Sequence, residues 1–455
     1  MCPLAKTNGS LDLWSSTPER GSSKSLLRQT DVLVIGAGAS GLLASVLLAR
    51  SGFQVTLLEA EAQAGQKLAL TGGGRCNIGR YESTEDVLPH YAQASRFLTS
   101  ALTRFSPLRQ LEILSDLGLK LEQEEQRAYV KGGAAHARDQ LIQQALDYGV
   151  NLILNARVSH LELSQPLIAH CDRGKFAASA ILIATGGGSF AHTGSTGQML
   201  QLLGRLNFSL RPFSDGLRAF SIKQNDLVQS LSGISLPDVD ISFHSSLLKA
   251  KQNPLRAKGS LLLTQKGLSG TSVLNLSRYL YRPEEKHDQI WVDFFPEASK
   301  HMKRRNAELD PEHAQQHIEE LLRQSPKMKI VDLYASVLPL RMRKSFLEKA
   351  LFDPQLQIAQ LNRAERLRLL ELWHHHPFEV CRDEKELRRH CGMVSTGGLS
   401  LKEISPKTFS AKRFPQLFFA GELLDIDGDC GGYNLIACFA SALAAVEGIQ
   451  ELLRS

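Results

Sequence analysis

The chain of 455 residues has few cysteines, and none of them forms a C-x-x-C pair. The seven thiols are scattered and odd in number: Cys2, Cys76, Cys171, Cys381, Cys391, Cys430 and Cys438. This pattern argues against a disulfide framework and against a redox dithiol, and it favours a reducing compartment. We therefore expect a cytoplasmic protein.

The sequence also lacks a long apolar run, because none approaches the roughly 20 residues of a membrane span. The first 29 residues are polar and bear several serines, and they include Asp12 and Glu19 in place of an apolar signal segment. We expect residues 1–29 to be a disordered leader. No association with a membrane is predicted.

Hydrophobic content of 43% and charged content of 22% are typical of a soluble globular protein, and the length predicts two or three domains. The net charge of +6 comes from residues 206–395, which hold 29 Lys and Arg against 23 Asp and Glu. The densest basic runs are Lys303 to Arg305, Arg341 to Lys344 and Arg363 to Arg368. Such runs form solvated helix faces or bind an anionic partner such as RNA.

The most informative stretch is residues 31–77, which read DVLVIGAGASGLLASVLLARSGFQVTLLEAEAQAGQKLALTGGGRCN. An apolar strand turns through three glycines into an apolar helix, and a second strand ends on an acid. Gly36 permits the tight turn, Gly38 lets the backbone approach a pyrophosphate, and Gly41 lets helix and strand pack closely. The helix N-terminus then offers N–H groups to the phosphates.

Glu59 lies 18 residues after Gly41, where a carboxylate can accept hydrogen bonds from both ribose hydroxyls. An acid at this place favours an unphosphorylated ribose and hence FAD or NAD rather than NADP. A glycine-rich turn alone is common and weak evidence. Here the strand, helix, second strand and acid all stand in register, so we predict a dinucleotide site.

The later chain predicts a split domain. Residues 30–205 form the first segment of an α/β, Rossmann-like FAD-binding domain, with a parallel sheet in a three-layer arrangement, and residues 396–455 return to it. Residues 206–395 form an inserted substrate domain of mixed β/α type, β-rich first and then helical. The strand AILIATGGG resembles a turn of FAD proteins with a glutathione-reductase-type fold, which would place Thr185 and Gly186 near the cofactor. Val158 would then offer a backbone amide to the adenine.

The last segment, QLFFAGELLDIDGDCGGYNLIACFASALAAVEGIQELL, reads as a strand, an acidic glycine-rich loop and a long apolar helix. Residues 431–434 open that helix and would aim N–H groups at the pyrimidine edge of a flavin, where negative charge develops on reduction. Glu422 or Asp425 would reach the ribityl or pyrophosphate region. The alternative for either acid is an ordinary solvated residue.

Together these motifs resemble the YhiN-like flavoproteins, also called the BaiN/RdsA family of FAD-dependent oxidoreductases. The matching segments are GAGASG, AGQKLALTGGGRCN, IATGGGSFAHTGSTG, LLLTQKGLSGTSVLNLS, VSTGGLSLKEISPKTF and LFFAGELLDIDGDCGGYNL. The resemblance implies FAD at the junction of two domains. It implies cofactor contacts at Gly36, Ala37, Gly38, Gly41, Glu59, Lys67, Arg75, Gly421, Glu422, Gly431, Gly432 and Asn434. We also expect contacts from four residues of the same motifs, namely Ala39, Gly74, Asn77 and Tyr433.

The chain departs from the family pattern on the side expected to face the substrate. Thr271 stands where the family usually has a proline, and residues 436–438 replace a more polar helix opening. Several members also lack a helical stretch like residues 330–390. The cofactor is therefore carried over more securely than the substrate.

The motif TGGGRCN supplies the one candidate catalytic residue. Its glycines let the backbone pass close to the cofactor, and Lys67 or Arg75 can balance pyrophosphate or reduced-flavin charge. Cys76 could protonate one carbon of a C=C bond while the flavin delivers hydride to the other. The competing interpretation is that Cys76 is a small apolar filler.

No second dinucleotide turn of this quality follows, because residues 186–188 lack an acid-ended strand in the right place. NAD(P)H, the expected reductant, would bind only transiently at the flavin face. The histidines at 374–376 and the pair His313 and His317 lack a carboxylate or cysteine framework, so no metal site is predicted.

The leading hypothesis is an FAD-dependent oxidoreductase in which NAD(P)H drives the reduction of a conjugated C=C bond. The resemblance implies the substrate, because similar proteins include reducers of bile-acid enones and an enzyme that makes dihydrouridine in ribosomal RNA. We therefore expect an RNA substrate, a uridine of ribosomal RNA, or a small-molecule enone, and the basic middle segment favours the RNA. One alternative is a flavin amine oxidase of the aminoacetone type that uses oxygen. The other is a flavoprotein scaffold without enzymatic activity. The oligomeric state is not predicted.

Overall fold

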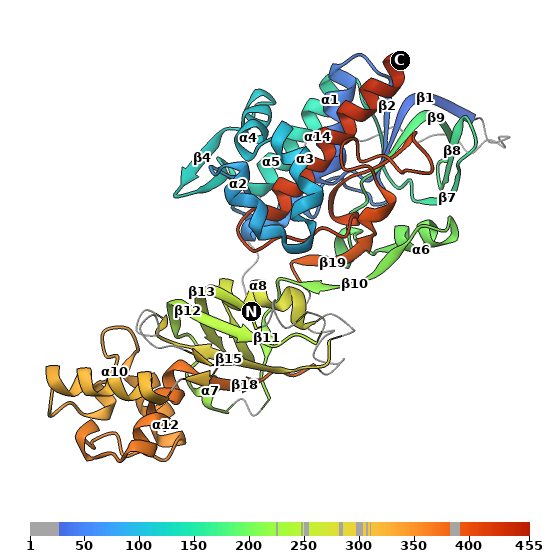
Figure 1. Cartoon of the computed structure of the whole chain (residues 1–455). Helices are drawn as coiled ribbons and strands as arrows, with labels where there is room; N and C mark the ends of the chain where they lie inside the picture. Colours follow the sequence, from blue (N-terminus) through green and yellow to red (C-terminus); the bar gives the residue numbers. More distant parts are fainter. Residues whose placement is uncertain are drawn as a thin grey trace.

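The computed structural model describes residues 27–223, 226–246, 249, 254–281, 285–296, 304–305, 308–309, 311–382 and 392–455. These residues form two lobes, the upper one built from both ends of the chain and the lower one from its middle (Figure 1). The predicted leader falls outside the described residues up to position 26, and residues 27–29 already belong to the first strand.

A seven-stranded sheet forms the centre of the upper lobe, in the order β6-β2-β1-β9-β8-β7 with β20 also paired to β9. Pairing is parallel from β6 to β9 and to β20, and antiparallel along β9, β8 and β7. The strands are β1 (Leu27–Ile35), β2 (Val55–Leu58), β6 (Asn151–Ile153), β7 (Val158–Glu162), β8 (Leu167–Cys171), β9 (Gly174–Ile183) and β20 (Leu417–Phe419). The expected Rossmann-like α/β fold with a parallel sheet is confirmed.

Three helices pack together beside this sheet: α1 (Ala39–Arg50), α5 (Gly133–Asp147) and α14 (Tyr433–Arg454). Helix α14 comes from the far end of the sequence and lies against α1 (Figure 1). By length and composition alone α14 could cross a membrane, although the sequence analysis found no such run. In the structure 67% of its apolar window is buried, so α14 serves as a core helix of this lobe.

Shorter elements complete the upper lobe. A three-stranded sheet has the order β3-β5-β4, and the lobe also contains several short helices. These elements are η1 (Leu68–Gly74), β3 (Asn77–Arg80), α2 (Thr84–Val87), η2 (Leu88–Ala94), α3 (Ser95–Arg104), α4 (Pro107–Asp116), β4 (Leu121–Glu124), β5 (Arg127–Val130), η3 (Ala191–Thr193), α6 (Gln198–Arg205), η7 (Leu401–Glu403) and η8 (Gly421–Leu423).

The lower lobe contains an antiparallel sheet of six strands in the order β11-β14-β13-β12-β15-β18. Its strands are β11 (Phe220–Ser221), β12 (Ser235–Phe243), β13 (Leu255–Thr264), β14 (Gly267–Ser269), β15 (Gln289–Asp293) and β18 (His376–Glu379), and a separate pair is β16 (Arg304–Arg305) with β17 (Glu308–Leu309). Its helices are α7 (Asp226–Ser230), α8 (Thr271–Leu280), α10 (Pro311–Gln324), η5 (Ile330–Asp332), α11 (Leu340–Lys349), η6 (Ile358–Gln360) and α12 (Arg363–His374).

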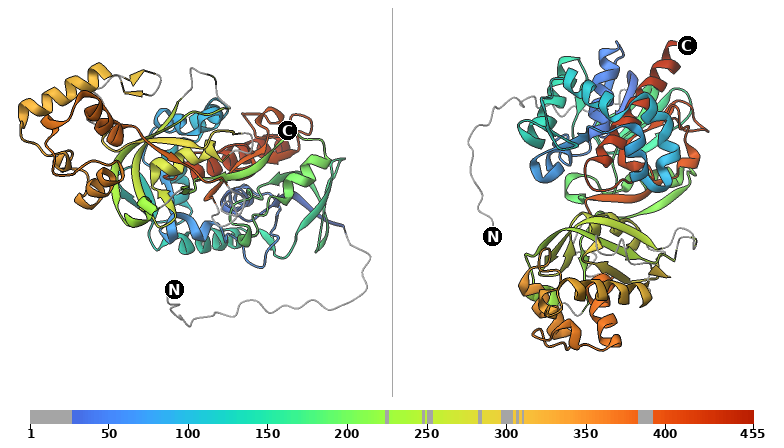
Figure 2. Two further views of the ribbon diagram at one scale, coloured as in Figure 1. Left: turned by 90° about the horizontal axis from the view of Figure 1, so that it is seen from below. Right: turned by 60° about the vertical axis from the view of Figure 1, so that its left-hand side comes forward.

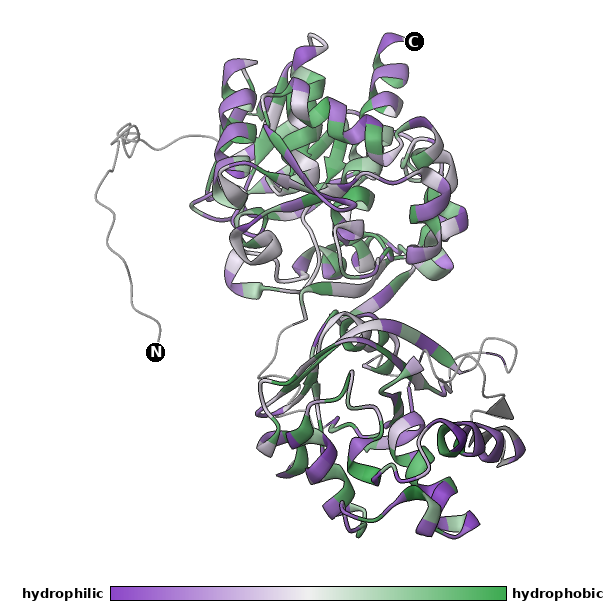
Figure 3. Ribbon diagram, turned by 90° about the vertical axis from the view of Figure 1, so that its left-hand side faces the viewer, coloured by the Kyte–Doolittle hydropathy of each residue, from purple (hydrophilic) through white to green (hydrophobic). Residues whose placement is uncertain are grey.

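Each lobe has its own hydrophobic core, one within residues 32–208 and 399–449 and the other within 220–380. Hydrophobic residues gather inside each lobe, and the outer helices are largely hydrophilic (Figure 3). The antiparallel pair β10 (Leu210–Gly216) and β19 (Val394–Leu399) lies where the lobes meet (Figures 1 and 2). The domain division expected at residues 395/396 therefore falls inside a strand that both lobes share.

Candidate functional site

A cavity of about 830 Å³ runs through the upper lobe to the junction with the lower one. At one end lie residues that follow strands of the parallel sheet, as expected for ligands of such folds. At the other end the lining includes Leu217, Thr271, Met393 and Val394, which come from the segment expected as the inserted domain. One continuous space is thus shared by the two lobes.

The three glycines of the first turn have separable roles. Gly36 has φ 101°, and a Cβ there would lie 2.5 Å from the carbonyl oxygen of Ala184. A Cβ on Gly41 would lie 1.9 Å from the carbonyl oxygen of Gly36, so the helix could not approach the turn. Gly38 lines the cavity and has an ordinary φ of −82°. A Cβ at this position would have no described neighbouring atom within 4 Å. The first and third glycines serve packing, and the second leaves room for a ligand.

Glu59 lies directly after β2 and is held against this turn. Its carboxylate accepts hydrogen bonds from the backbone N–H groups of Ala37 and Glu61, both at 2.9 Å. Burial raises the pKa of Glu59, although the two N–H donors oppose that shift. Glu59 and Val158 both line the cavity, together with Ala37 and Ala39.

An ion pair lies further along the cavity. Lys67 and Glu422, which both line it, form an ion pair. Lys67 also donates to the hydroxyl of Ser189 at 2.5 Å, and that hydroxyl donates to Glu422 at 3.0 Å. The backbone N–H of Ser395 donates to Glu422 at 2.6 Å. Glu422 therefore joins segments from four distant parts of the chain at one point of the cavity wall.

Two residues of the cavity lining, Thr185 and Asn77, each have a buried side-chain oxygen (Oγ1 and Oδ1) without a hydrogen-bond partner among the described residues. Buried polar atoms are normally paired, so each of these oxygens marks a place beside the cavity where the described residues leave a polar group unsatisfied. Gly186 lies beside Thr185 with φ 74° and also lines the space.

The N-terminus of α14 closes the same region. Gly431 and Gly432 have φ values of 129° and 105°, and a Cβ on Gly432 would lie 2.9 Å from Asn77 Oδ1. No side chain of the described residues caps this helix or α1, so backbone N–H groups of both helix starts remain for a ligand. Asn434 lines the cavity and holds the preceding loop by accepting from the N–H of Gly428 at 2.8 Å.

These features fit the FAD that the sequence leads us to expect. The volume is that of a ligand site, Gly38 leaves space at the start of α1, and two lining residues hold buried oxygens that the described residues leave unpaired. Arg75 and Gly421 also line it. Most of the residues expected to contact the cofactor are thus brought together.

Four expected cofactor contacts are absent from the lining. Gly41 packs against Gly36, and Gly74 stands near the cavity only through its neighbours Gly73 and Arg75. Asp425 accepts a hydrogen bond from Arg211 at 3.0 Å. The Tyr433 ring stacks on His90, with ring centroids 3.9 Å apart.

The sequence analysis missed several lining residues, namely Arg127, Tyr129, Phe190, residues 193–198, Cys430 and Leu435. Phe190 and residues 193–197 belong to the segment FAHTGSTG of a quoted motif, so they could have been found. Tyr129 reaches the cavity because β5 pairs with β3 beside Asn77, and no local pattern signals that pairing.

Cys76 does not line the cavity, and its side chain is 0% exposed. Burial raises the pKa of its thiol to about 12. A thiol that is sealed in the core and does not reach the cavity cannot deliver a proton to a ligand there. The structure therefore argues against Cys76 as the proton donor and favours the apolar-filler interpretation.

A Cys76→Ala variant is expected to keep turnover within about twofold of wild type, because the thiol touches no reacting atom. The unfolding free energy should fall by about 1 kcal/mol, since the small cavity left behind loses packing. The matched variant is Cys430→Ala, whose thiol lines the cavity and whose loss should lower turnover further. Steady-state rates of both variants provide the comparison, and a larger loss in Cys76→Ala would restore the original assignment.

Among the described residues no group of three or more His, Cys, Asp or Glu is placed to hold a metal ion. His374 is fully buried and bonds to Asp293 at 3.0 Å and to the hydroxyl of Tyr334 at 2.5 Å. Of the other pair considered, His317 bonds to Tyr334 at 3.1 Å, and the side chain of His313 lies outside the described residues.

Comparison with known proteins gives consistent matches over nearly the whole chain. The family model described as HI0933-like protein Rossmann domain matches residues 30–448. A ribosomal RNA dihydrouridine synthase of Haemophilus influenzae is 27% identical over 427 residues, covering 92% of this chain and 98% of that protein. A 3-dehydro-bile acid delta(4,6)-reductase of Clostridium scindens is 27% identical over 426 residues, with the same two coverages of 92% and 98%.

Among solved structures, one similar chain is a 3-ketosteroid-delta4-(5alpha)-dehydrogenase of Rhodococcus jostii RHA1 in complex with 4-androstene-3,17-dione. It shares 14% sequence identity at a TM-score of 0.47, covering 92% of this chain and 97% of that chain.

Proposed function

Since this chain belongs to the family of HI0933-like proteins with a Rossmann domain, we propose that it is an FAD-dependent oxidoreductase that reduces a conjugated C=C bond with NAD(P)H. The observation that carries the proposal is the cavity that combines a dinucleotide site with a compartment at the lobe junction. A cofactor and a substrate can meet in such a space without crossing bulk solvent.

The residues on the wall have separate tasks in this proposal. Gly38 and the start of α1 hold the pyrophosphate, and Glu59 holds a ribose. The N-terminus of α14 lines the cavity through Gly432 and Asn434 and would lie beside the flavin ring. FAD, when bound, supplies hydride transfer between a nicotinamide and the substrate.

The junction end of the cavity has apolar side chains that can pack against the face of a flat substrate ring. Leu217 and Val394 line it and pack with Cys430. Cys430 and Tyr129 bring the proton-bearing groups to the wall, and burial raises the pKa of Cys430, so its thiol keeps its proton at neutral pH. Either group can supply the proton that completes reduction of a C=C bond.

A uridine in ribosomal RNA is the substrate we favour, and a small enone is the other. Relatives that match along nearly their whole length are named as a ribosomal RNA dihydrouridine synthase and as a bile acid reductase. The lower lobe adds the reason for choosing RNA, because α11 and α12 expose basic side chains that could contact phosphates. These exposed residues are Arg341, Lys344, Lys349, Arg363 and Arg368.

The substrate proposal is tested by mass spectrometry of ribosomal RNA from a strain that lacks the gene. We expect the deletion strain to carry a uridine at one position where the parent strain carries dihydrouridine. The wild-type gene should restore that dihydrouridine, and a gene for the Gly38→Ala variant should not. Unchanged dihydrouridine in the deletion strain would exclude the RNA substrate. Peroxide release with small amines, and no reduction by NADH or NADPH, would favour an oxidase instead.

A further inference from the structure

The loop from Asp427 to Gly432 forms part of the cavity wall without regular structure of its own. Cys430, Gly431 and Gly432 line the cavity directly before α14 begins. Two consecutive glycines at positive φ have wide conformational freedom, so this loop cannot fix its own shape. Contacts from other segments must hold it in place.

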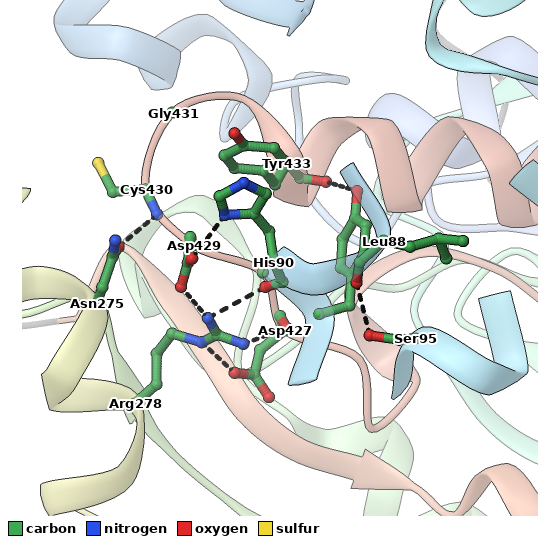
Figure 4. A network of polar contacts seen from close by, with 12 residues as sticks. Leu88, His90, Ser95, Asn275, Arg278, Asp427, Asp429, Cys430, Gly431 and Tyr433 are labelled. Atoms are coloured by element: carbon green, nitrogen blue, oxygen red, sulfur yellow. Dashed lines mark hydrogen bonds and ion pairs between the residues drawn. The ribbon is translucent and has the colours of Figure 1, made fainter. Parts of the chain in front are cut away.

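Arg278 supplies the strongest of these contacts, and it comes from α8 in the lower lobe (Figure 4). Its side chain is 3% exposed. Nε donates to the Asp427 carboxylate at 2.5 Å, one terminal nitrogen donates to the Asp427 carbonyl oxygen at 2.6 Å, and the other forms an ion pair with Asp429. That nitrogen also donates to the carbonyl oxygen of His90 at 3.3 Å.

Asn275, one turn earlier on α8, holds the next part of the loop. Its side-chain oxygen accepts a hydrogen bond from the backbone N–H of Cys430 at 2.8 Å (Figure 4). Positions three apart on a helix share a face, so Asn275 and Arg278 act on the loop together. Helix α8 of the lower lobe therefore binds the loop on both sides of Asp429, at Asp427 and at Cys430.

The network continues from the loop to the first residue of α14. Asp429 bonds to Nδ1 of His90 at 2.7 Å, and the His90 ring stacks on Tyr433. The hydroxyl of Tyr91 donates to the carbonyl oxygen of Tyr433 at 2.7 Å. A displacement of Arg278 would thus reach the helix start that lines the cavity.

The charges of the network require the arginine. Burial alone would lower the pKa of Arg278, but the attraction of Asp427 and Asp429 outweighs it and raises the pKa. Asp427 is only 7% exposed, so its carboxylate has little water to solvate it once the guanidinium is removed.

We propose that Arg278 is a positioning residue for the cofactor site. Because Arg278 belongs to the lower lobe, the shape of the cavity wall then depends on how that lobe is positioned against the upper lobe. The inference rests on the proposed function, because the wall in question is the one assigned to the flavin. Arg278 itself does not line the cavity and acts only through the loop that it holds.

The test measures the affinity of the apoprotein for FAD and the visible spectrum of the bound flavin. In Arg278→Met we expect the affinity to fall at least tenfold and the flavin band to shift, with partial recovery in Arg278→Lys, which keeps the charge. Asn275→Ala should lower the affinity for FAD several-fold while the carboxylates of Asp427 and Asp429 stay paired with Arg278. This variant therefore tests the inference if Arg278→Met unfolds. The matched control is Arg256→Met, which removes another arginine of the lower lobe, paired with Asp240 at 3.2 Å and away from the cavity.

Wild-type affinity and an unshifted spectrum in folded Arg278→Met, or in Asn275→Ala if Arg278→Met unfolds, would overturn the inference and leave the proposed function standing. An equal loss of affinity in Arg256→Met would overturn it too, since the effect would then be a general loss of stability. A wild-type protein that binds no FAD would overturn the proposed function and this inference with it.

Discussion

A Gly38→Ala variant is expected to fold normally and to lose FAD binding by at least 100-fold, or about 2.7 kcal/mol. Gly38 has φ −82°, which alanine adopts freely, and a Cβ there meets no atom within 4 Å. The methyl group would instead occupy cavity space at the start of α1, where a pyrophosphate must approach the backbone. Equilibrium titration of the apoprotein with FAD measures the loss.

The unfolding free energy of the Gly38→Ala apoprotein should differ from that of the wild-type apoprotein by less than about 1 kcal/mol, the usual scale of a change at a helix N-cap. Gly41→Ala is the contrasting variant, because its Cβ would lie 1.9 Å from the carbonyl oxygen of Gly36. That variant should lose more than about 2 kcal/mol of unfolding free energy even without cofactor, as overpacking does. Undiminished FAD affinity in Gly38→Ala would show that no phosphate passes this turn.

A Glu422→Ala variant is expected to lose about 2–3 kcal/mol of unfolding free energy. The carboxylate is 15% exposed and pairs with Lys67, which is 26% exposed, so solvent screens the pair only in part. The substitution also removes the hydrogen bonds from Ser189 at 3.0 Å and from Ser395 at 2.6 Å. Denaturant unfolding of the apoprotein measures the change.

The control for this prediction is an exposed ion pair of the same lobe. Lys407 and Glu451 lie 3.7 Å apart with side chains 64% and 54% exposed. Lys407→Met should alter the unfolding free energy by less than about 0.5 kcal/mol. Equal effects of the two substitutions would mean that Glu422 does not tie the cavity wall together.

The parts that the sequence predicts well are those encoded by neighbouring residues. The turn through Gly36, Gly38 and Gly41 and the acid at the end of the second strand come from one short stretch, and its local pattern is enough to place them. The return of the chain to the same sheet follows from a strand, a loop and an apolar helix in sequence.

The parts that failed depend on residues far apart in the chain. Asp425 does not face the cavity because Arg211, 214 positions away, binds it. Tyr433 stacks on His90, and the tie between Arg278 and Asp427 spans 149 positions. Cys76 stands in a convincing motif, yet the backbone turns there at φ 60° and its thiol is buried in the core. Spacing along a sequence does not encode such contacts.

The central claim is that this cavity holds FAD and exchanges electrons there with a nicotinamide. The direct measurement is anaerobic titration of the FAD-loaded protein with NADH and with NADPH, followed at the visible flavin band. We expect one of the two nucleotides to bleach the band, and a conjugated C=C substrate added afterwards to restore it. A chain that takes up no FAD, or a bound flavin that neither nucleotide reduces, would contradict the account.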